Sequence, residues 1–152
     1  TRKESSAASD VYKRQIVFWT GSGNTEAMAQ AVEEGARNAG ADVELSFVGD
    51  TSAGDVAAFD KIILGCPAMG NENLEEYDFE PFFEELLPEL QGKTVGIFGS
   101  YSWNEGEWIQ IWKNRLTEAG VELAAEPVKA YSYPDDDALE LCRELGKVIA
   151  GV

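Results

Sequence analysis

Histidine is absent from all 152 residues of the chain, and cysteine occurs only twice, as Cys66 and Cys142. Without histidine the chain has no Ser-His triad, lacks the commonest general base and cannot form most kinds of zinc site. The two cysteines are far apart and form no Cys-x-x-Cys motif, which favours a reducing compartment, so we expect a cytoplasmic protein. These absences argue against a serine hydrolase and against most zinc enzymes.

Positive charge is also scarce, with 12 Lys and Arg against 28 Asp and Glu and a formal net charge of −16. Nucleic acids and anionic membranes bind basic surfaces, so we expect neither as a partner. No apolar stretch approaches the length of a membrane span, and we expect no secretory signal. The charge would attract a protein partner with a basic docking patch, although it also serves solubility.

The first residues differ in character from the rest. Residues 1–14 hold four basic and two acidic side chains and no apolar periodicity, and residues 6–15 (SAASDVYKRQ) resemble a translated sequencing adapter. We expect residues 1–14 to be a disordered or artefactual tail. Residues 15–152 are long enough for one domain with a full core and too short for two.

Extended and helical patterns alternate along this domain. Continuous apolar runs predict three central parallel strands, at residues 16–19, 62–66 and 95–98. Alternating patterns at residues 43–47 and 121–125 predict two edge strands, the second followed by Pro127. Amphipathic stripes predict the intervening helices, within residues 28–39, 79–90, 108–119 and 141–149. The sequence therefore predicts an α/β fold, a doubly wound five-stranded parallel sheet of order 2-1-3-4-5 with helices on both faces.

A phosphate-binding turn without lysine or arginine follows the first strand, at residues 18–26 (FWTGSGNTE). Its donors are small side chains and free N–H groups at the start of a helix. The residues expected around the anion are Thr20, Gly21, Ser22, Gly23, Asn24 and Thr25. A P-loop would need a lysine after the second glycine, and a dinucleotide fingerprint a third glycine where Glu26 stands. The turn therefore predicts a site for one terminal monophosphate without magnesium.

Two further loops are expected beside this turn, at residues 67–73 (PAMGNEN) and 99–106 (GSYSWNEG). Trp103 stands in a polar turn and is suited to stack on a planar heterocycle, with Met69 on the opposite face. Gly70 permits the chain to reverse direction, and Glu72 offers an acceptor for a ring N–H. Taken singly, Trp103 could cap the sheet and Met69 could fill a gap. Together with the phosphate turn, they predict flavin mononucleotide (FMN).

The chain resembles the short-chain flavodoxins of anaerobic bacteria, from about residue 15 to its C-terminus. The matching stretches are residues 18–26, 64–72 (LGCPAMGNE) and 99–108 (GSYSWNEGEW). The resemblance implies that the turn at residues 20–25 holds the phosphate, that Trp103 and Met69 flank the isoalloxazine ring and that Glu72 binds its pyrimidine edge. It also implies that the peptide after Gly70 turns on reduction, so that its carbonyl accepts a hydrogen bond from flavin N5–H.

The second and third loops complete the predicted cofactor site. Their expected members are Pro67, Ala68, Met69, Gly70, Asn71, Glu72, Ser100, Tyr101, Trp103 and Gly106. The chain departs from the family pattern at four of the loop positions. Ser102 and Asn104 stand where glycine is common, Asn71 where Asp, Ser or Thr is frequent, and Pro67 where some relatives have Ser.

The resemblance implies a low-potential electron carrier, not an enzyme, that passes single electrons between redox enzymes. Expected partners are flavodoxin or ferredoxin reductases, or ferredoxin-utilising oxidoreductases, with basic docking patches, and we expect a monomer. The acidic run at residues 72–89 would lower the potential of the second electron, although much of it is the solvated face of a helix. Two alternatives stay open: an FMN-dependent NAD(P)H:quinone reductase-like enzyme, and a dedicated activator of one redox enzyme. A signalling receiver domain is rejected because the acidic residues that it needs after the first and third strands are missing.

Overall fold

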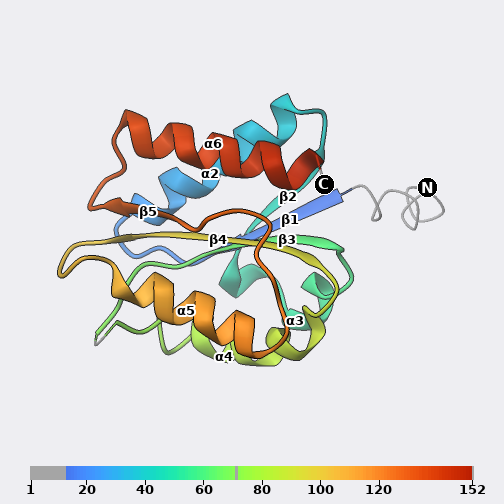
Figure 1. Cartoon of the computed structure of the whole chain (residues 1–152), viewed down its shortest axis with the longest axis horizontal. Helices are drawn as coiled ribbons and strands as arrows, with labels where there is room; N and C mark the ends of the chain where they lie inside the picture. Colours follow the sequence, from blue (N-terminus) through green and yellow to red (C-terminus); the bar gives the residue numbers. More distant parts are fainter. Residues whose placement is uncertain (1–12, 71, 152) are drawn as a thin grey trace.

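A computed structural model describes residues 13–70 and 72–151. Five strands form one parallel sheet in the order β2-β1-β3-β4-β5, as the sequence predicts. The strands are β1 (Lys13–Phe18), β2 (Asp42–Phe47), β3 (Lys61–Gly65), β4 (Thr94–Tyr101) and β5 (Val128–Tyr131). The helices are α2 (Asn24–Asn38), α3 (Ala53–Val56), α4 (Phe79–Leu86), α5 (Glu107–Glu118) and α6 (Asp136–Gly151), with short 3-10 turns at Val48–Asp50 and Leu87–Glu89. Helices α2 and α6 cover one face of the sheet, and α3, α4 and α5 cover the other (Figure 1).

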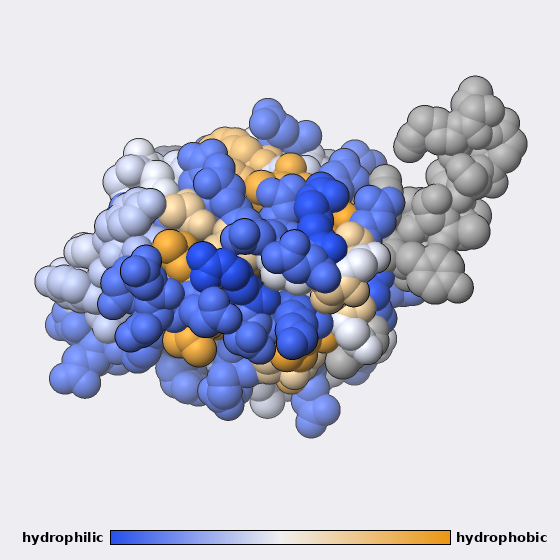
Figure 2. Space-filling view, turned by 90° about the horizontal axis from the view of Figure 1, so that it is seen from above, coloured by the Kyte–Doolittle hydropathy of each residue, from blue (hydrophilic) through white to orange (hydrophobic). Residues whose placement is uncertain are grey.

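Two hydrophobic cores lie on the two faces of the sheet. Alternate residues of β1 divide between them: Ile16 and Phe18 pack with α2 and α6, while Val17 packs with the core of α3, α4 and α5. This division explains why the central strands have no polar face in the sequence. The surface over α6 and α2 is mostly hydrophilic, with small separate hydrophobic areas (Figure 2).

Helices α2 and α6 approach one another backbone to backbone. A Cβ on Gly35 would lie 2.0 Å from the carbonyl oxygen of Arg143, and one on Gly146 would lie 2.1 Å from that of Val32. Both distances are far below any real contact, so only glycine allows this approach. The close approach therefore lies along the second half of α2, at Val32 and Gly35.

The fifth strand was wrongly predicted. Residues 121–125 form only an isolated bridge, between Leu123 and Val95, and the strand that pairs with β4 is β5, where Phe98 stands opposite Val128. Both segments alternate in burial, so the pattern could not choose between them. Pro127 precedes the edge strand instead of following it, because a proline without an N–H can enter a strand but not continue its ladder.

The domain also begins earlier than residue 15. Strand β1 starts at Lys13, whose register partner is Asp42, and the Nη2 of Arg14 donates to the carbonyl of Ala150 across 2.7 Å. The remainder of the predicted tail, residues 1–12, lies outside the described residues. Within the described residues, no helix is long and apolar enough to cross a membrane, and no cluster of Cys, Asp and Glu is arranged to hold a metal ion.

Candidate functional site

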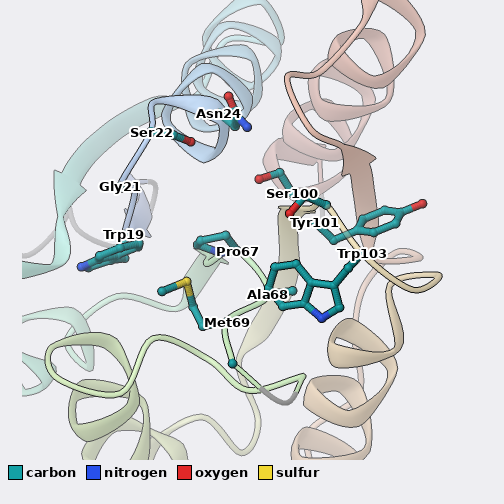
Figure 3. A pocket seen from close by; sticks show the side chains of 12 residues that line it. Trp19, Gly21, Ser22, Asn24, Pro67, Ala68, Met69, Ser100, Tyr101 and Trp103 are labelled. Atoms are coloured by element: carbon teal, nitrogen blue, oxygen red, sulfur yellow. The ribbon is translucent and has the colours of Figure 1, made fainter.

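The carboxyl ends of the three central strands are in register, which brings three loops to one place. Phe18 of β1 pairs with Gly65 of β3, and Gly65 pairs with Phe98 of β4. Beyond these residues lies an open cavity of about 390 Å³ (Figure 3). It is lined by Trp19, Gly21, Ser22, Asn24, Pro67, Ala68, Met69, Gly70, Ser100, Tyr101, Ser102 and Trp103. The cavity therefore lies between β1 and β3, where the winding direction of the sheet switches.

One end of the cavity offers neutral hydrogen-bond donors. Ser22 and Asn24 lie there at the start of α2, and Ser100 lies across the cavity from them (Figure 3). The N-cap of α2 is Gly23, whose backbone is left-handed (φ 95°). Among the described residues, no capping side chain accepts a hydrogen bond from the first N–H groups of this helix. The first N–H groups of a helix without such a cap can bind an anion. None of the twelve lining residues carries a charge, so a phosphate would be held by dipoles alone.

Two predicted phosphate ligands act within the protein here. Thr20 Oγ1 accepts a hydrogen bond of 2.9 Å from the backbone N–H of Gly23, which closes the turn. The Oγ1 of Thr25 lies 3.4 Å from the Oγ of Ser100, and both side chains are buried. These contacts fix the phosphate turn against the end of β4, so Thr20, Gly23 and Thr25 shape the turn without lining the cavity.

The other end of the cavity is apolar and suited to a flat ring. Met69 and Trp103 lie on either side of it, and Trp19 and Pro67 complete its wall (Figure 3). Trp103 is 38% exposed, so its indole stands at the mouth and not in a core. The prediction that Met69 and Trp103 approach one ligand from two sides is compatible with this arrangement.

The 69–73 loop is tightly closed. Met69 and Asn73 exchange two backbone hydrogen bonds of 2.8 Å, and the N–H of Ala68 donates to the carbonyl of Ser100. Gly70 has a left-handed backbone (φ 51°), which glycine adopts without steric cost. Asn71 lies outside the described residues, so the turn of the peptide after Gly70 stays a prediction.

Two other predicted site residues do not line the cavity. The carboxylate of Glu72 turns towards α5, where its Oε1 accepts from the N–H of Trp108 and its Oε2 from the Nδ2 of Asn104. Gly106 is the N-cap of α5, with a left-handed backbone (φ 81°). Both residues therefore organise the start of α5 beside the site.

The prediction missed Trp19 and Ser102 as lining residues. Trp19 was assigned to a buried strand, but β1 ends at Phe18, and the Trp19 N–H donates to the carbonyl of Gly65 as the chain leaves the sheet. The sequence did offer one indication, because Trp19 directly precedes Thr20, the first residue of the predicted phosphate turn. Ser102 stands between two predicted members, Tyr101 and Trp103, and that adjacency was sufficient to include it.

The residues fit FMN in size, polarity and charge. The neutral donors at one end suit a monophosphate, and the apolar slot between Met69 and Trp103 suits an isoalloxazine ring. The nearby Cys66 is fully buried, and burial raises the pKa of its thiol far above the ordinary value, so it stays protonated and unreactive. The Cys66 thiol is therefore not an activated nucleophile beside the site.

Comparison with known proteins agrees with this fit. The sequence model of the flavodoxin family matches residues 16–146. The chain is 48% identical to the flavodoxin of Megasphaera elsdenii over 136 residues, which are 90% of this chain and 97% of that protein. It is 41% identical to the flavodoxin of Clostridium beijerinckii over 138 residues, 91% of this chain and 99% of that protein.

Solved structures agree in fold as well. The solution structure of two-electron reduced Megasphaera elsdenii flavodoxin matches with a TM-score of 0.80 at 47% identity, covering 91% of this chain and 98% of that one. The crystal structure of oxidised flavodoxin 1 from Bacillus cereus matches with the same TM-score at 28% identity, covering 91% and 97%. The chain therefore belongs to the flavodoxin family, whose members bind FMN non-covalently and carry electrons rather than catalyse reactions.

Proposed function

We propose that the chain holds FMN in the 390 Å³ cavity and exchanges single electrons with docked redox proteins. The observation that carries the proposal is the joint presence of a neutral phosphate end and a half-exposed Trp103 at the apolar end. A ring placed against Trp103 would have an edge near the surface, within reach of a partner. FMN supplies the one-electron chemistry when it is bound.

The residues of the chain divide the work of binding. Ser22, Asn24 and the first N–H groups of α2 hold the phosphate, while Thr20 and Thr25 keep the turn in shape. Met69 and Trp103 exclude water from the two faces of the ring. Because no cation lines the cavity, the bound phosphate and the acidic surface both disfavour further negative charge, which supports a low potential.

The acidic run at residues 72–89 is not uniform in its role. Glu75 is only 4% exposed, and its carboxylate accepts from three backbone N–H groups, those of Tyr77, Asp78 and Phe79. Glu80 pairs with Arg115 across 2.6 Å. These two carboxylates are structural. The exposed acidic residues are Glu76, Asp78, Glu84, Glu85 and Glu89, and we assign the docking charge to them together with the exposed Glu105 of the Trp103 loop.

Partners of this surface carry basic patches, which fits flavodoxin or ferredoxin reductases and ferredoxin-utilising oxidoreductases. The hydrophilic face over α2 and α6 supports a monomeric carrier (Figure 2), and a cytoplasmic location fits the two free, buried cysteines.

The test is to measure the rate of electron transfer from a reductase to the FMN-loaded protein. The rate is recorded by stopped-flow absorbance at a series of increasing salt concentrations. We expect the rate to fall with salt, and Glu76→Lys and Glu105→Lys to slow it several-fold. Glu118→Lys is the matched control, because Glu118 is exposed at the far end of α5 and should change the rate little. Equal rates at all salt concentrations and in all three variants would contradict the docking surface. Rapid NADH oxidation with quinone in the absence of any reductase would contradict the carrier itself.

A further inference from the structure

A single carboxylate joins the two loops that flank the apolar end of the cavity. Glu72 belongs to the loop that carries Met69 and Gly70. Asn104 belongs to the loop that carries Trp103, and Trp108 lies in the first turn of α5, which follows that loop. The Oε1 of Glu72 accepts from the backbone N–H of Trp108 across 2.8 Å, and its Oε2 accepts from the Nδ2 of Asn104 across 2.9 Å. Glu72 and Asn104 are 32 residues apart in the sequence.

Both partners of the side-chain contact have an unusual backbone. Glu72 has a φ of 61° and Asn104 a φ of 55°, although neither is glycine. A left-handed backbone is sterically unfavourable for most L-residues, and less so for asparagine. Glycine would adopt the same backbone at position 104 without steric strain. The side chain of Asn104 is therefore not needed for the turn, and among the described residues its amide donates a hydrogen bond to Glu72.

We propose that Asn104 is a positioning residue, which fixes the Glu72 carboxylate and so holds the Met69 loop at a set position relative to the Trp103 loop. The proposal rests on the proposed function in one respect, that the FMN ring lies between these loops. Each carboxylate oxygen has two lone pairs and uses one of them here. Glu72 therefore remains able to accept a bond from a ring N–H while it keeps both protein contacts. The slot is preorganised before the ring enters, which lowers the cost of binding.

The first variant is Asn104→Gly, which keeps the left-handed backbone and removes the amide. One hydrogen bond to a charged group is lost, so we expect the dissociation constant of FMN to rise about threefold to tenfold. In the apoprotein, exchange of the Trp108 amide proton, measured by NMR, should quicken by a similar factor, because Glu72 is less well held. This second readout requires no cofactor.

A pair of variants separates positioning from charge. Asn104→Asp sets two carboxylates against each other and should weaken FMN binding more than Asn104→Gly does. In the double variant Glu72→Gln, Asn104→Asp, the Gln amide can donate to the Asp carboxylate, and its oxygen can still accept from Trp108 N–H. The double variant has the net charge of the original chain, so we expect it to recover most of the affinity and the slow Trp108 exchange.

The outcomes distinguish the two proposals. Failure of the unaltered protein to bind FMN would overturn the proposed function. Normal FMN binding, with unchanged affinity and unchanged Trp108 exchange in Asn104→Gly, would overturn the positioning role alone. Failure of the double variant to bind better than Asn104→Asp would also overturn it, because the effect would then not depend on the contact between positions 72 and 104.

Discussion

The indole Nε1 of Trp108 donates a hydrogen bond to the carbonyl oxygen of Cys66 across 3.1 Å, inside the core. The bond ties the first turn of α5 to the end of β3, directly before Pro67 of the cavity wall. Gly99 leaves the space for it, since a Cβ at that position would lie 2.2 Å from the Cys66 oxygen and 2.8 Å from the Trp108 ring. The second and third loops are thus joined by the indole of Trp108 as well as by the carboxylate of Glu72.

Trp108→Phe should lower the free energy of unfolding more than Trp112→Phe does. Both indoles are 1% exposed, so the two changes leave comparable cavities, but the Nε1 of Trp112 has no hydrogen-bond partner among the described residues. Only Trp108→Phe leaves a buried carbonyl unpaired, and we expect it to cost about 1–3 kcal/mol more. Urea unfolding of the two apoproteins provides the comparison. Equal losses in both variants would mean that the Trp108–Cys66 bond adds nothing to stability.

The central sheet could be predicted because its three strands are continuous apolar runs, which only a sheet covered on both faces requires. The edge was harder. Residues 121–125 and 128–131 both alternate in hydropathy, and what separates them is pairing with β4, a long-range property. The position of Val128 opposite Phe98 therefore could not be read from the local pattern.

In the candidate site, too, local sequence predicted some features and long-range contacts determine others. The loop members were predicted because small donors and glycines in a turn have few other uses. The direction of the Glu72 carboxylate was not, because its partners, Asn104 and Trp108, follow 32 and 36 residues later. Glu75 belongs to a run of acidic residues, which predicts a solvent-exposed side chain. Its carboxylate is instead buried and accepts hydrogen bonds from N–H groups at the start of α4. A charge run does not show which of its members caps a helix.

Trp103→Ala should weaken FMN binding without unfolding the protein. The side chain is 38% exposed, so the free energy of unfolding of the apoprotein should change by only about 0.5 kcal/mol. Loss of a stacked aromatic ring should raise the dissociation constant of FMN about tenfold. FMN titration followed by tryptophan fluorescence measures it, and the quenching seen with the unaltered protein should shrink. The matched control is Tyr131→Ala, an exposed aromatic that packs on Tyr101 but does not line the cavity. An equal loss of affinity in both variants would argue against stacking on Trp103.

Glu80→Gln should destabilise the protein at neutral pH and less so in acid. Hydrogen bonds from Arg115 lower the pKa of Glu80 below its ordinary value, with distances of 2.9 and 2.6 Å to the two carboxylate oxygens. A carboxylate whose pKa is lowered by folding contributes stability above its unfolded pKa, about 4.3, and loses that contribution as the pH falls through the lower folded value.

The expected difference at pH 7 is on the order of 1 kcal/mol, because the pair is partly exposed. Urea unfolding at a series of pH values should show the difference between Glu80→Gln and the unaltered protein narrowing below about pH 4.3. Glu85→Gln, an exposed carboxylate on the same helix, should show little difference at any pH. A constant difference for Glu80→Gln from neutral to acid pH would exclude the ion pair as its source.

Asn24→Ala should reduce the preference of the protein for FMN over riboflavin. Asn24 lies at the start of α2 and lines the cavity where no charged side chain is available, so each neutral donor carries a large share of phosphate binding. Loss of a donor to a charged group costs about 1–3 kcal/mol, or roughly fivefold to 150-fold in the dissociation constant of FMN. Riboflavin lacks the phosphate and should bind Asn24→Ala and the unaltered protein alike.

The control for this change is Met69→Leu, at the opposite end of the cavity. It should affect FMN and riboflavin by the same factor, because both ligands carry the ring. Fluorescence titrations with both ligands give, for each of the three proteins, the ratio of the riboflavin dissociation constant to the FMN dissociation constant. We expect this ratio to fall in Asn24→Ala and to stay unchanged in Met69→Leu. If Asn24→Ala weakened riboflavin as much as FMN, the polar end of the cavity would not be the phosphate site, and the orientation of the cofactor between α2 and Trp103 would have to be reversed.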